Sequence, residues 1–564
     1  MPSDSTSPNL LLPSSHFLGC PLSESKGCTM AEDHNAKDTL KPLVFRLHES
    51  VPKVVREVLM ERGWSEFDEQ EQDKSDWNLY WRNTPFHVTD HHNIKPWQRL
   101  NHYPETVKIT RKDYLARNLK RMKGIYGSAL YKFSPVAFIM PNDYVKFIAE
   151  YSKERQSQGR KSSYWICKPV NLSRGRGILI FQDIKDLIYD CVVIVQKYIS
   201  NPLLISGYKW DLRLYVCVTS FCPLTIYTYE EGLVRFATEK FDLSSLDNVY
   251  AHLTNTSINK FGPSYKKDKV GIGRGCKWTF SKCRSYLCSR GVDDLLLWQR
   301  INNIVTLTLL AITPSVPLTH NCFELFGFDI LIDDKFKPWL LEVNCSPALR
   351  LDCSIDATVK KGLLHDVIEL LNYKQIDTLR QNKMARTKSS CASKQQQTEC
   401  TTASPVQSLL EVAGRSFSKE AIVTRKAARA HPRKTLTSQL RERMNMPKPC
   451  FPSRAASNSK PILGTLHHVP VPGQDTQWLP TELCKNKLSI PPYFLTDQDK
   501  RPFPRIGDFV LIFPFNDAAL QASRNGIDVK GIIQEIHKLM NEQLSRGIQK
   551  VKEKKDYLTI QKCL

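Results

Sequence analysis

Two acidic side chains and one amide lie close together in residues 323–344. Apolar and polar residues alternate on both sides of a polar turn whose midpoint falls just after residue 335, which is typical of a β-hairpin rather than of a helix. In a hairpin that is symmetric about this midpoint, Asp329 lies opposite Glu342, and Asn344 shares a face with Glu342. We therefore expect three oxygen-bearing side chains to converge at one place.

Such a hairpin also has an apolar face that we expect to be buried. Its members are Phe328, Ile330, Ile332, Leu341 and Val343. On the polar face, two neighbouring carboxylates repel each other unless a cation lies between them, and an all-oxygen set of ligands suits Mg²⁺. The alternative is that both carboxylates are solvated side chains of a half-exposed hairpin, and the hairpin alone does not decide between these interpretations.

A second stretch whose residues could bind a ligand or take part in catalysis is SSYWICKPVNLSRGRGILIF, residues 162–181. The pattern predicts a strand that carries Lys168, a glycine-containing turn at residues 173–177 and a second strand. Glycines let a loop approach a ligand closely and turn its N–H groups toward phosphate oxygens, and Lys168 adds a positive charge. The stretch indicates a hairpin folded over a nucleotide; a nucleic-acid-binding Arg-Gly loop or a plain turn fits the same letters. No helix start of the GK[ST] type follows, so the pattern is not a Walker A site.

Two further strands are predicted beside this hairpin. Residues 192–195 form a buried strand that leads into residues 196–199, and this position is suited to meeting the edge of an adenine. In residues 208–218, alternation puts Lys209, Asp211 and Arg213 on one face. Lysine neutralises phosphate and arginine binds carboxylate in a bidentate way, but three charges on one strand face also fit a solvated edge.

The remaining periodic segments are predicted to position these groups. They are helices at residues 51–62, 110–121 and 292–312 and a strand at residues 77–81. The segment HLTNTSINK, residues 252–260, is polar and suits a loop on the substrate side. A later helix is expected to be capped by Ser354 or Asp356, with Lys360 off its buried stripe.

The chain of 564 residues is basic, with 80 Lys and Arg against 57 Asp and Glu and a net charge of +23. Residues 380–460 hold 17 basic and 4 acidic side chains, so more than half of the excess lies there, and such a segment suits an acidic partner. We do not expect nucleic acid as the partner, because Phe417 and Phe451 are the only aromatic residues available there for stacking on bases. We expect no membrane partner either, because the longest apolar run, Ile304–Ile312, is too short to span a bilayer.

Five motifs, taken in order, resemble the tubulin tyrosine ligase-like family. They are WICKPVNLSRGRGI, VQKYI, YKWDLRLYV, HLTNTSINK and FELFGFDILIDDKFKPWLLEVNCSPAL. The resemblance runs from about Phe45 to Asn372 and is strongest to the glutamate-adding branch of the family. It implies an α+β fold with an ATP-grasp catalytic core, a small N-terminal α/β module and a largely disordered basic C-terminal region.

The resemblance also implies roles for individual residues. ATP would be bound by Lys168, Arg174, Gly175, Arg176, Gly177, Ile178, Gln196, Lys197, Tyr198, Ile199, Lys209, Asp211, Thr254 and Asn255. Mg²⁺ would be held by Asp329, Glu342 and Asn344. The incoming amino acid would be bound by Arg213, Ser257, Lys260 and Lys360, and the catalytic residues would be Lys168, Arg213 and Glu342.

Composition and resemblance together predict five segments. These are a disordered leader at 1–40, an N-terminal and central module at 41–160, the ATP-grasp domain at 161–373, a basic disordered linker at 374–500 and a small strand and helix segment at 501–564. The last segment is expected to dock back on the core, because DFVLIFPFN within it has strand character.

The implied activity is an ATP- and Mg²⁺-dependent ligation of free L-glutamate to glutamate side chains in the acidic C-terminal tails of tubulin, through an acyl-phosphate. One alternative is a ligase for glycine or for a non-tubulin acceptor. Another is a catalytically weak basic protein that binds microtubules or nucleic acid. The implied location is the cytoplasm and cytoskeleton, including the cilium or basal body.

Overall fold

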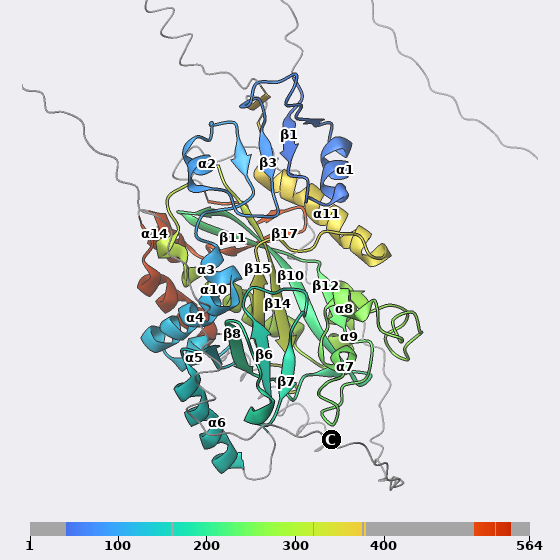
Figure 1. The fold of residues 1–564 in the computed structure, drawn as a ribbon. Coiled ribbons are helices and arrows are strands. Elements are labelled where there is room, and N and C mark those ends of the chain that lie inside the picture. Colours follow the sequence, from blue (N-terminus) through green and yellow to red (C-terminus); the bar gives the residue numbers. More distant parts are fainter. Residues whose placement is uncertain are drawn as a thin grey trace, which may run out of the picture. The chain divides into compact units, whose positions relative to one another are not determined.

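The computed structural model describes residues 41–158, 163–319, 321–374, 377–378, 501–524 and 526–542. The leader predicted at 1–40 and almost all of the linker predicted at 374–500 lie outside the described residues. The elements below are labelled as in Figure 1.

The N-terminal part is a small parallel sheet in the order β2-β1-β3-β4. Its strands are β1 (Val44–Leu47), β2 (Ser65–Glu66), β3 (Leu79–Trp81) and β4 (Arg99–Leu100), and its helices are α1 (Lys53–Glu61) and α2 (Val88–His92). The apolar side chains of α1 recur at helical spacing and are buried, at Val54, Val55, Val58 and Leu59. The helix and the strand predicted here are both present, and α1 packs against α11 (Ser354–Leu371).

A second sheet is antiparallel, in the order β5-β8-β6-β7. Its strands are β5 (Ala137–Met140), β6 (Trp165–Pro169), β7 (Leu179–Phe181) and β8 (Val193–Lys197). The nearby helices are α3 (Val107–Thr110), α4 (Lys112–Tyr126), α5 (Ser128–Tyr131) and α6 (Tyr144–Gln158), with a 3₁₀ turn η1 (Ile184–Asp186). Trp165 is fully buried in this sheet beside Phe147 of α6. Because β5 precedes residue 161, this sheet draws strands from both sides of the boundary predicted there.

The main sheet has nine strands and is organised around one long central strand, β10 (Tyr208–Phe221). Its other strands are β9 (Leu204–Ile205), β11 (Leu224–Tyr229), β12 (Leu233–Phe236), β13 (Lys277–Thr279), β14 (Glu324–Ile332), β15 (Pro338–Asn344), β16 (Arg505–Ile506) and β17 (Phe509–Phe513). Strand β10 pairs with β11 and β12 and also with β14, all antiparallel. The central position of β10 explains why nearly every one of its side chains is buried.

The main sheet is accompanied by α7 (Val249–His252), α8 (Thr256–Asn259), α9 (Phe280–Ser289), α10 (Asp294–Leu310), η2 (Thr313–Ser315), α11 and α14 (Asp517–Arg524), and residues 529–542 are also helical. Helix α10 was predicted and buries Leu297, Ile301 and Ile304. By length and composition alone, residues 294–315 would be long and apolar enough to cross a bilayer. Because most of this stretch is buried and α10 packs against β15 and β17, we interpret it as a core helix.

The C-terminal segment contributes β17, which pairs antiparallel with β11. Phe509 and Phe513 of β17 are fully buried, and the Phe509 ring lies 5.0 Å from that of Tyr229. The backbone N–H of Asp508 donates to a carboxylate oxygen of Asp366 in α11 at 2.9 Å. The segment therefore docks on the core as predicted and forms part of the main sheet.

Candidate active site

The hairpin β14–β15 brings the predicted oxygen ligands together. Asp329 pairs with Glu342, and Gly327 pairs with Asn344, which is the register predicted from the sequence. The turn itself is one residue shorter than that register requires, and a bulge after Asp329 makes up the difference. The expectation that Leu341 is buried with the apolar face is therefore wrong: Leu340 takes that place at 1% exposure, while Leu341 lines the pocket.

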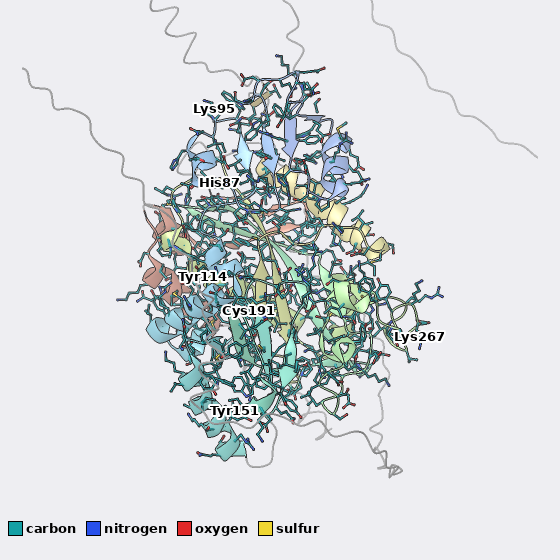
Figure 2. All side chains as sticks on the ribbon, viewed as in Figure 1. His87, Lys95, Tyr114, Tyr151, Cys191 and Lys267 are labelled. Atoms are coloured by element: carbon teal, nitrogen blue, oxygen red, sulfur yellow. The ribbon has the colours of Figure 1, made fainter. Side chains whose placement is uncertain are left out.

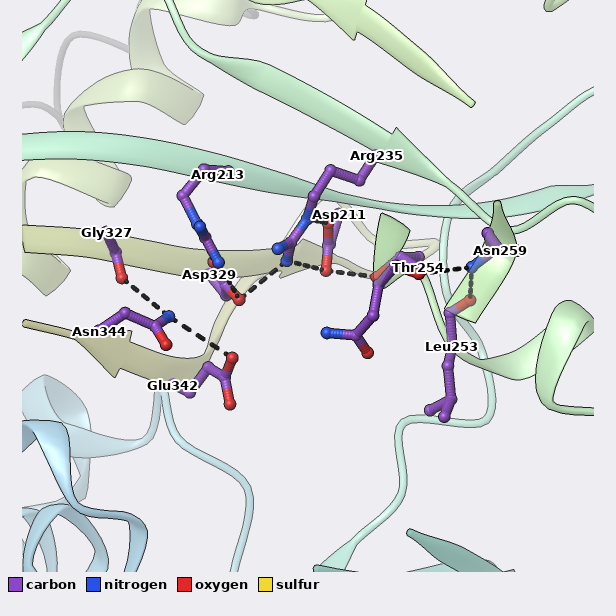
Figure 3. A network of polar contacts seen from close by, with 11 residues as sticks. Asp211, Arg213, Arg235, Leu253, Thr254, Asn259, Gly327, Asp329, Glu342 and Asn344 are labelled. Atoms are coloured by element: carbon purple, nitrogen blue, oxygen red, sulfur yellow. Dashed lines mark hydrogen bonds and ion pairs between the residues drawn. The ribbon is translucent and has the colours of Figure 1, made fainter. Parts of the chain in front are cut away.

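The charged side chains of β10 form a buried network rather than a solvated edge. Lys209, Asp211 and Arg213 are exposed by 7%, 2% and 8% respectively. Arg213 donates to both carboxylate oxygens of Asp329, at 2.6 and 3.0 Å. Arg235, on the neighbouring strand β12, donates twice to Asp211 at 2.7 Å and lies 2.8 Å from Asp329 (Figure 3). Two arginines thus balance two aspartates inside the sheet.

This network gives the two hairpin carboxylates opposite tendencies. Burial disfavours the charge on Asp329, but Arg213 and Arg235 outweigh that effect and hold its pKa well below the ordinary value. Burial raises the pKa of Glu342, and the negative charge of Asp329 raises it further. Ionised Glu342 therefore lacks the compensation that Asp329 has, and a cation beside it would lower its free energy.

The donor set at this place fits Mg²⁺. It consists of Asp329, Glu342 and Asn344, all of which offer oxygen. The amide nitrogen of Asn344 donates to Oε1 of Glu342 at 3.5 Å, so these two side chains lie side by side. The part of the chain that the structure describes contains no cluster of three or more His, Cys, Asp or Glu suited to a metal, so the third side chain of this set is an amide. No cysteine is among the residues that line this pocket in the described part of the chain, so the site lacks the thiolate ligands that favour zinc.

Two lysines face the same pocket, Lys209 buried and Lys168 half-buried. Lys168 of β6 donates to Oε1 of Gln196 at 2.8 Å, and burial lowers its pKa to about 8. Lys209 donates to the Tyr198 hydroxyl at 2.8 Å, and burial lowers its pKa to about 7. Because desolvation is the main cause in both cases, an anion that entered the pocket would favour the protonated forms. The pair is therefore suited to phosphate groups.

The turn between β6 and β7 closes over this pocket, as the sequence predicted. Arg174, Gly175 and Gly177 all have positive φ, at 61°, 78° and 67°. A Cβ atom at Gly175 would lie 2.2 Å from Cδ1 of Ile258, so the turn approaches α8 as closely as glycine permits. The Ser257 hydroxyl donates to the Arg174 carbonyl at 3.2 Å, which joins α8 to the turn.

One pocket gathers most of the predicted nucleotide residues. It is lined by Lys168, Arg174, Gly175, Arg176, Ile178, Gln196, Lys197, Tyr198, Ile199, Lys209, Asp211, Thr254 and Asn255, together with Asp329 and Glu342. Gly177 and Asn344 do not line it, although both belong to elements that border it. The residues of four separate sequence motifs therefore meet in one cavity beside the two hairpin carboxylates.

The model of the tubulin-tyrosine ligase family matches residues 89–383 of the chain. The chain belongs to this family. It is 55% identical over 536 residues to the probable tubulin polyglutamylase TTLL2 of Homo sapiens. The matched region covers 92% of this chain and 88% of that protein. It is 52% identical over 518 residues to the probable tubulin polyglutamylase TTLL2 of Mus musculus, covering 91% and 94% of the two chains. The tubulin polyglutamylase TTLL5 of Mus musculus is 36% identical over 343 residues, 59% of this chain and 25% of that protein.

Membership of the tubulin-tyrosine ligase family confirms the α+β, ATP-grasp fold class and makes the chain an ATP-dependent ligase. The family match ends at residue 383, so β17 of the main sheet lies beyond it. The relatives named TTLL2 cover this part of the chain as well, because they match more than nine tenths of it.

The residues predicted to bind the amino acid are not gathered in the pocket. Arg213 is held by Asp329, the Ser257 hydroxyl by the Arg174 carbonyl, and Lys260 is exposed beside the Phe261 ring. Lys360 was expected off the buried stripe of α11, and that expectation is wrong because it is only 3% exposed. Its ammonium lies 2.8 Å from Asp356, one helical turn earlier.

The predicted helix cap is also wrong. Cys353, rather than Ser354 or Asp356, precedes the first turn of α11, and its side chain makes no capping hydrogen bond. Asp356 is instead fully buried and also pairs with Lys277 of β13 at 2.6 Å. The helix therefore begins with an ion cluster rather than with a solvated cap.

Sequence reasoning missed two cationic residues that line the same pocket, Lys112 and Arg235. Lys112 opens α4 and donates to the Leu172 carbonyl at 2.6 Å, at the start of the glycine-containing turn. Its signal is the TRKD sequence, residues 110–113, at the start of the helix predicted at residues 110–121. Arg235 is a single arginine in an apolar strand, and no local pattern distinguishes it from a surface charge.

Proposed function

We propose that this ligase adds glutamate to glutamate side chains in the acidic C-terminal tails of tubulin. The observation that carries the proposal is the single pocket in which Lys168 and Lys209 lie on the same cavity as Asp329 and Glu342. The two ammonium groups suit the phosphates of ATP, and the carboxylates suit the cation that accompanies them. The names of the relatives as tubulin polyglutamylases support the choice of substrates.

In this proposal the nucleotide lies under the turn between β6 and β7. The backbone N–H groups of Arg174–Ile178 and the ammonium groups of Lys168 and Lys209 hold the phosphates. The end of β8, from Gln196 to Ile199, meets the adenine, and Asp211, Thr254 and Asn255 complete the site. Thr254 donates to Asp211 at 2.6 Å, so these two side chains are already fixed in relation to each other.

Asp329, Glu342 and Asn344 would hold Mg²⁺ next to the phosphates. When bound, the ion would neutralise charge on the triphosphate during phosphoryl transfer. Arg213 and Arg235 fix the carboxylate of Asp329 on its other side. We therefore propose that both arginines position Asp329.

The proposed chemistry has two balanced steps. A carboxylate oxygen of the acceptor glutamate attacks the γ-phosphorus of ATP, which forms an acyl-phosphate and releases ADP as the bond to the β-phosphate oxygen breaks. The amine of free glutamate then attacks the acyl carbon, which forms an amide and releases phosphate and a proton. Lys168 and Lys209 stabilise negative charge on the transferring phosphoryl group by fixed electrostatics. An isopeptide branch on the acceptor side chain results.

The incoming glutamate would be recognised by Arg213, Ser257, Lys260 and Lys360. In the described conformation Arg213 is paired with Asp329 and Lys360 with Asp356, so both would act on the substrate while these ion pairs stay in place. Lys260 is free to turn toward an anion, because its ammonium contacts only an aromatic ring among the described residues. Holding the substrate carboxylates orients the amine toward the acyl carbon.

The proposed partner and location follow from the acceptor. Tubulin tails are anionic, and the predicted linker segment 380–460 carries 17 basic and 4 acidic side chains. We propose that the protein works on microtubules in the cytoplasm and cytoskeleton, including those of the cilium or basal body.

The test is an incorporation assay with the purified full chain, ATP, Mg²⁺ and microtubules. Labelled glutamate, glycine and tyrosine are offered in parallel, and Glu342→Gln serves as the inactive control because it keeps the size of the side chain and removes its charge. We expect label from glutamate alone, and only with the unmodified chain. Incorporation restricted to glycine, or equal incorporation by the Glu342→Gln variant, would contradict the proposal.

A further inference from the structure

A cationic loop follows α8 directly. Residues 260–275, here called the basic loop, contain Lys260, Lys266, Lys267, Lys269 and Arg274 against a single acidic residue, Asp268. Lys260, Lys266, Lys267 and Arg274 are exposed, and no ion pair of these four occurs within the part of the chain that the structure describes. Figure 2 shows Lys267 on a loop that stands out from the neighbouring helices. Unpaired surface cations of this density are suited to an anionic partner.

The basic loop has a fixed shape although it is neither helix nor strand. The fifth cation, Lys269, is only 4% exposed, and its ammonium donates to the backbone carbonyls of Lys267 at 3.2 Å and Gly275 at 2.9 Å. Ile272 is buried in the core, and its carbonyl accepts a hydrogen bond from the Trp278 indole at 2.8 Å. The exposed lysines are therefore presented by an ordered loop, which lowers the entropic cost of binding a partner.

The basic loop also adjoins the candidate active site. It begins at the residue that ends α8, and α8 is joined to the glycine-containing turn by the hydrogen bond from Ser257 to Arg174. Asn255, which precedes α8, lines the nucleotide pocket. An extended chain that ran along this loop would thus approach the pocket from the side of α8. Phe261 and Val270, exposed by 75% and 93%, offer apolar contacts on the same loop.

We propose that the basic loop is a docking surface for the acidic acceptor segment, which it guides toward the active site. This proposal rests on the proposed function, because it takes the acceptor to be a glutamate-rich peptide. Lys266 and Lys267 would meet successive carboxylates of such a peptide.

The test compares two matched double charge reversals in the full chain. Lys266→Glu with Lys267→Glu changes the basic loop, and Lys153→Glu with Lys185→Glu changes two lysines that are also exposed, on α6 and η1. Both variants alter the net charge by the same amount and leave the segment 380–460 unchanged, so this segment contributes the same background to each. Melting temperatures of the two variants are compared with that of the unmodified chain to check folding.

The first readout is binding of a fluorescent peptide of ten glutamates, measured by anisotropy at moderate ionic strength. We expect the basic-loop variant to bind about tenfold more weakly, and the control variant to bind within about twofold of the unmodified chain. A glutamine peptide of the same length should bind none of the three proteins measurably. Equal losses in the two variants, or no loss in the basic-loop variant, would overturn the proposal.

The second readout is ligation kinetics, which separates this proposal from the proposed function. We expect the KM for the acceptor to rise about tenfold in the basic-loop variant while the KM for ATP stays the same. If the unmodified chain ligates no glutamate but the peptide binding follows our expectation, the proposed function fails and the docking surface stands. Binding of an oligothymidine is measured in the same way. If the basic-loop variant loses as much affinity for the oligothymidine as for the peptide, and its KM for the acceptor is unchanged, the loop is a nucleic-acid surface and the proposal is overturned.

Discussion

Replacing Glu342 by glutamine should stabilise the fold while it abolishes ligation. In the structure, burial and the charge of Asp329 both raise the pKa of Glu342, and the more distant ammonium groups of Lys168 and Lys112 offset only part of this cost. A neutral amide of the same size removes the repulsion and can donate to Asp329. We estimate a gain of about 1 to 2 kcal/mol in the free energy of unfolding at neutral pH, which corresponds to a melting temperature higher by about 1 to 4 °C.

The stability gained by Glu342→Gln should depend on pH. Because the folded-state pKa of Glu342 lies above its unfolded value, the protonated side chain stabilises the fold, and this contribution is lost as the pH rises through the folded-state pKa. The advantage of Glu342→Gln should therefore be full above the folded-state pKa and shrink as the pH falls through it. Thermal unfolding from acidic to neutral pH measures it, and ligation is assayed on the same samples. A variant that melts below the unmodified chain at neutral pH, or that still ligates, would refute the reasoning.

Three further predictions concern the pocket and the sheet. ATP affinity should fall as the pH rises from about 7 to about 9, because Lys209 and Lys168, with pKa values of about 7 and 8, lose the protons that bind phosphate. Calorimetry in this range should show proton uptake on ATP binding. An ATP affinity that does not change with pH would contradict this prediction. Gly175→Ala should weaken ATP binding about tenfold and cost about 1 to 2 kcal/mol of stability, because its Cβ would overlap α8. Gly63→Ala is the control, because Gly63 also has a positive φ, 77°, but a Cβ there would have no atom within 4 Å. It should leave ATP binding unchanged in the same titration. A chain that ends at residue 500 should be insoluble or unfolded, because it lacks β17. Co-expression of residues 501–564 should restore soluble protein, measured by size-exclusion chromatography. A truncated chain that folds alone would refute the role of β17.

Local alternation was enough to predict the centre of the site. The strand period placed Asp329 opposite Glu342 and grouped Lys209, Asp211 and Arg213 on one face, and the structure has both arrangements. The same rule misplaced Leu341, because a bulge changes the face of every residue on one side of it and leaves no mark in the composition of the strand.

Long-range pairing was not predictable from local pattern. The three charges on β10 look like a solvated edge until Arg235 from another strand is known to lie between Asp211 and Asp329. Lys360 looks exposed on its helix until Lys277 and Asp356 are brought beside it. In each case a buried charge is tolerated because its partner comes from a distant part of the sequence, and hydrophobic periodicity contains no information about that partner.

The resemblance to a family supplied what periodicity could not. It grouped the glycine-containing turn, the end of β8 and the hairpin into one nucleotide site, and the structure places these segments around one pocket. It did not indicate that Arg213 would be occupied by Asp329, since a motif specifies which residues are present and not how they are paired.

The position of β17 has a consequence for the making of the protein. More than a hundred residues separate the end of α11 from this strand, so a ribosome working at about 5 to 20 residues per second needs on the order of ten seconds to add it after the rest of the sheet is complete. During that interval β11 is exposed as a sheet edge, and the nascent chain is still open to pairing with other chains. Chaperone capture of the nascent chain is therefore expected to be concentrated in this interval, and to end when β17 emerges.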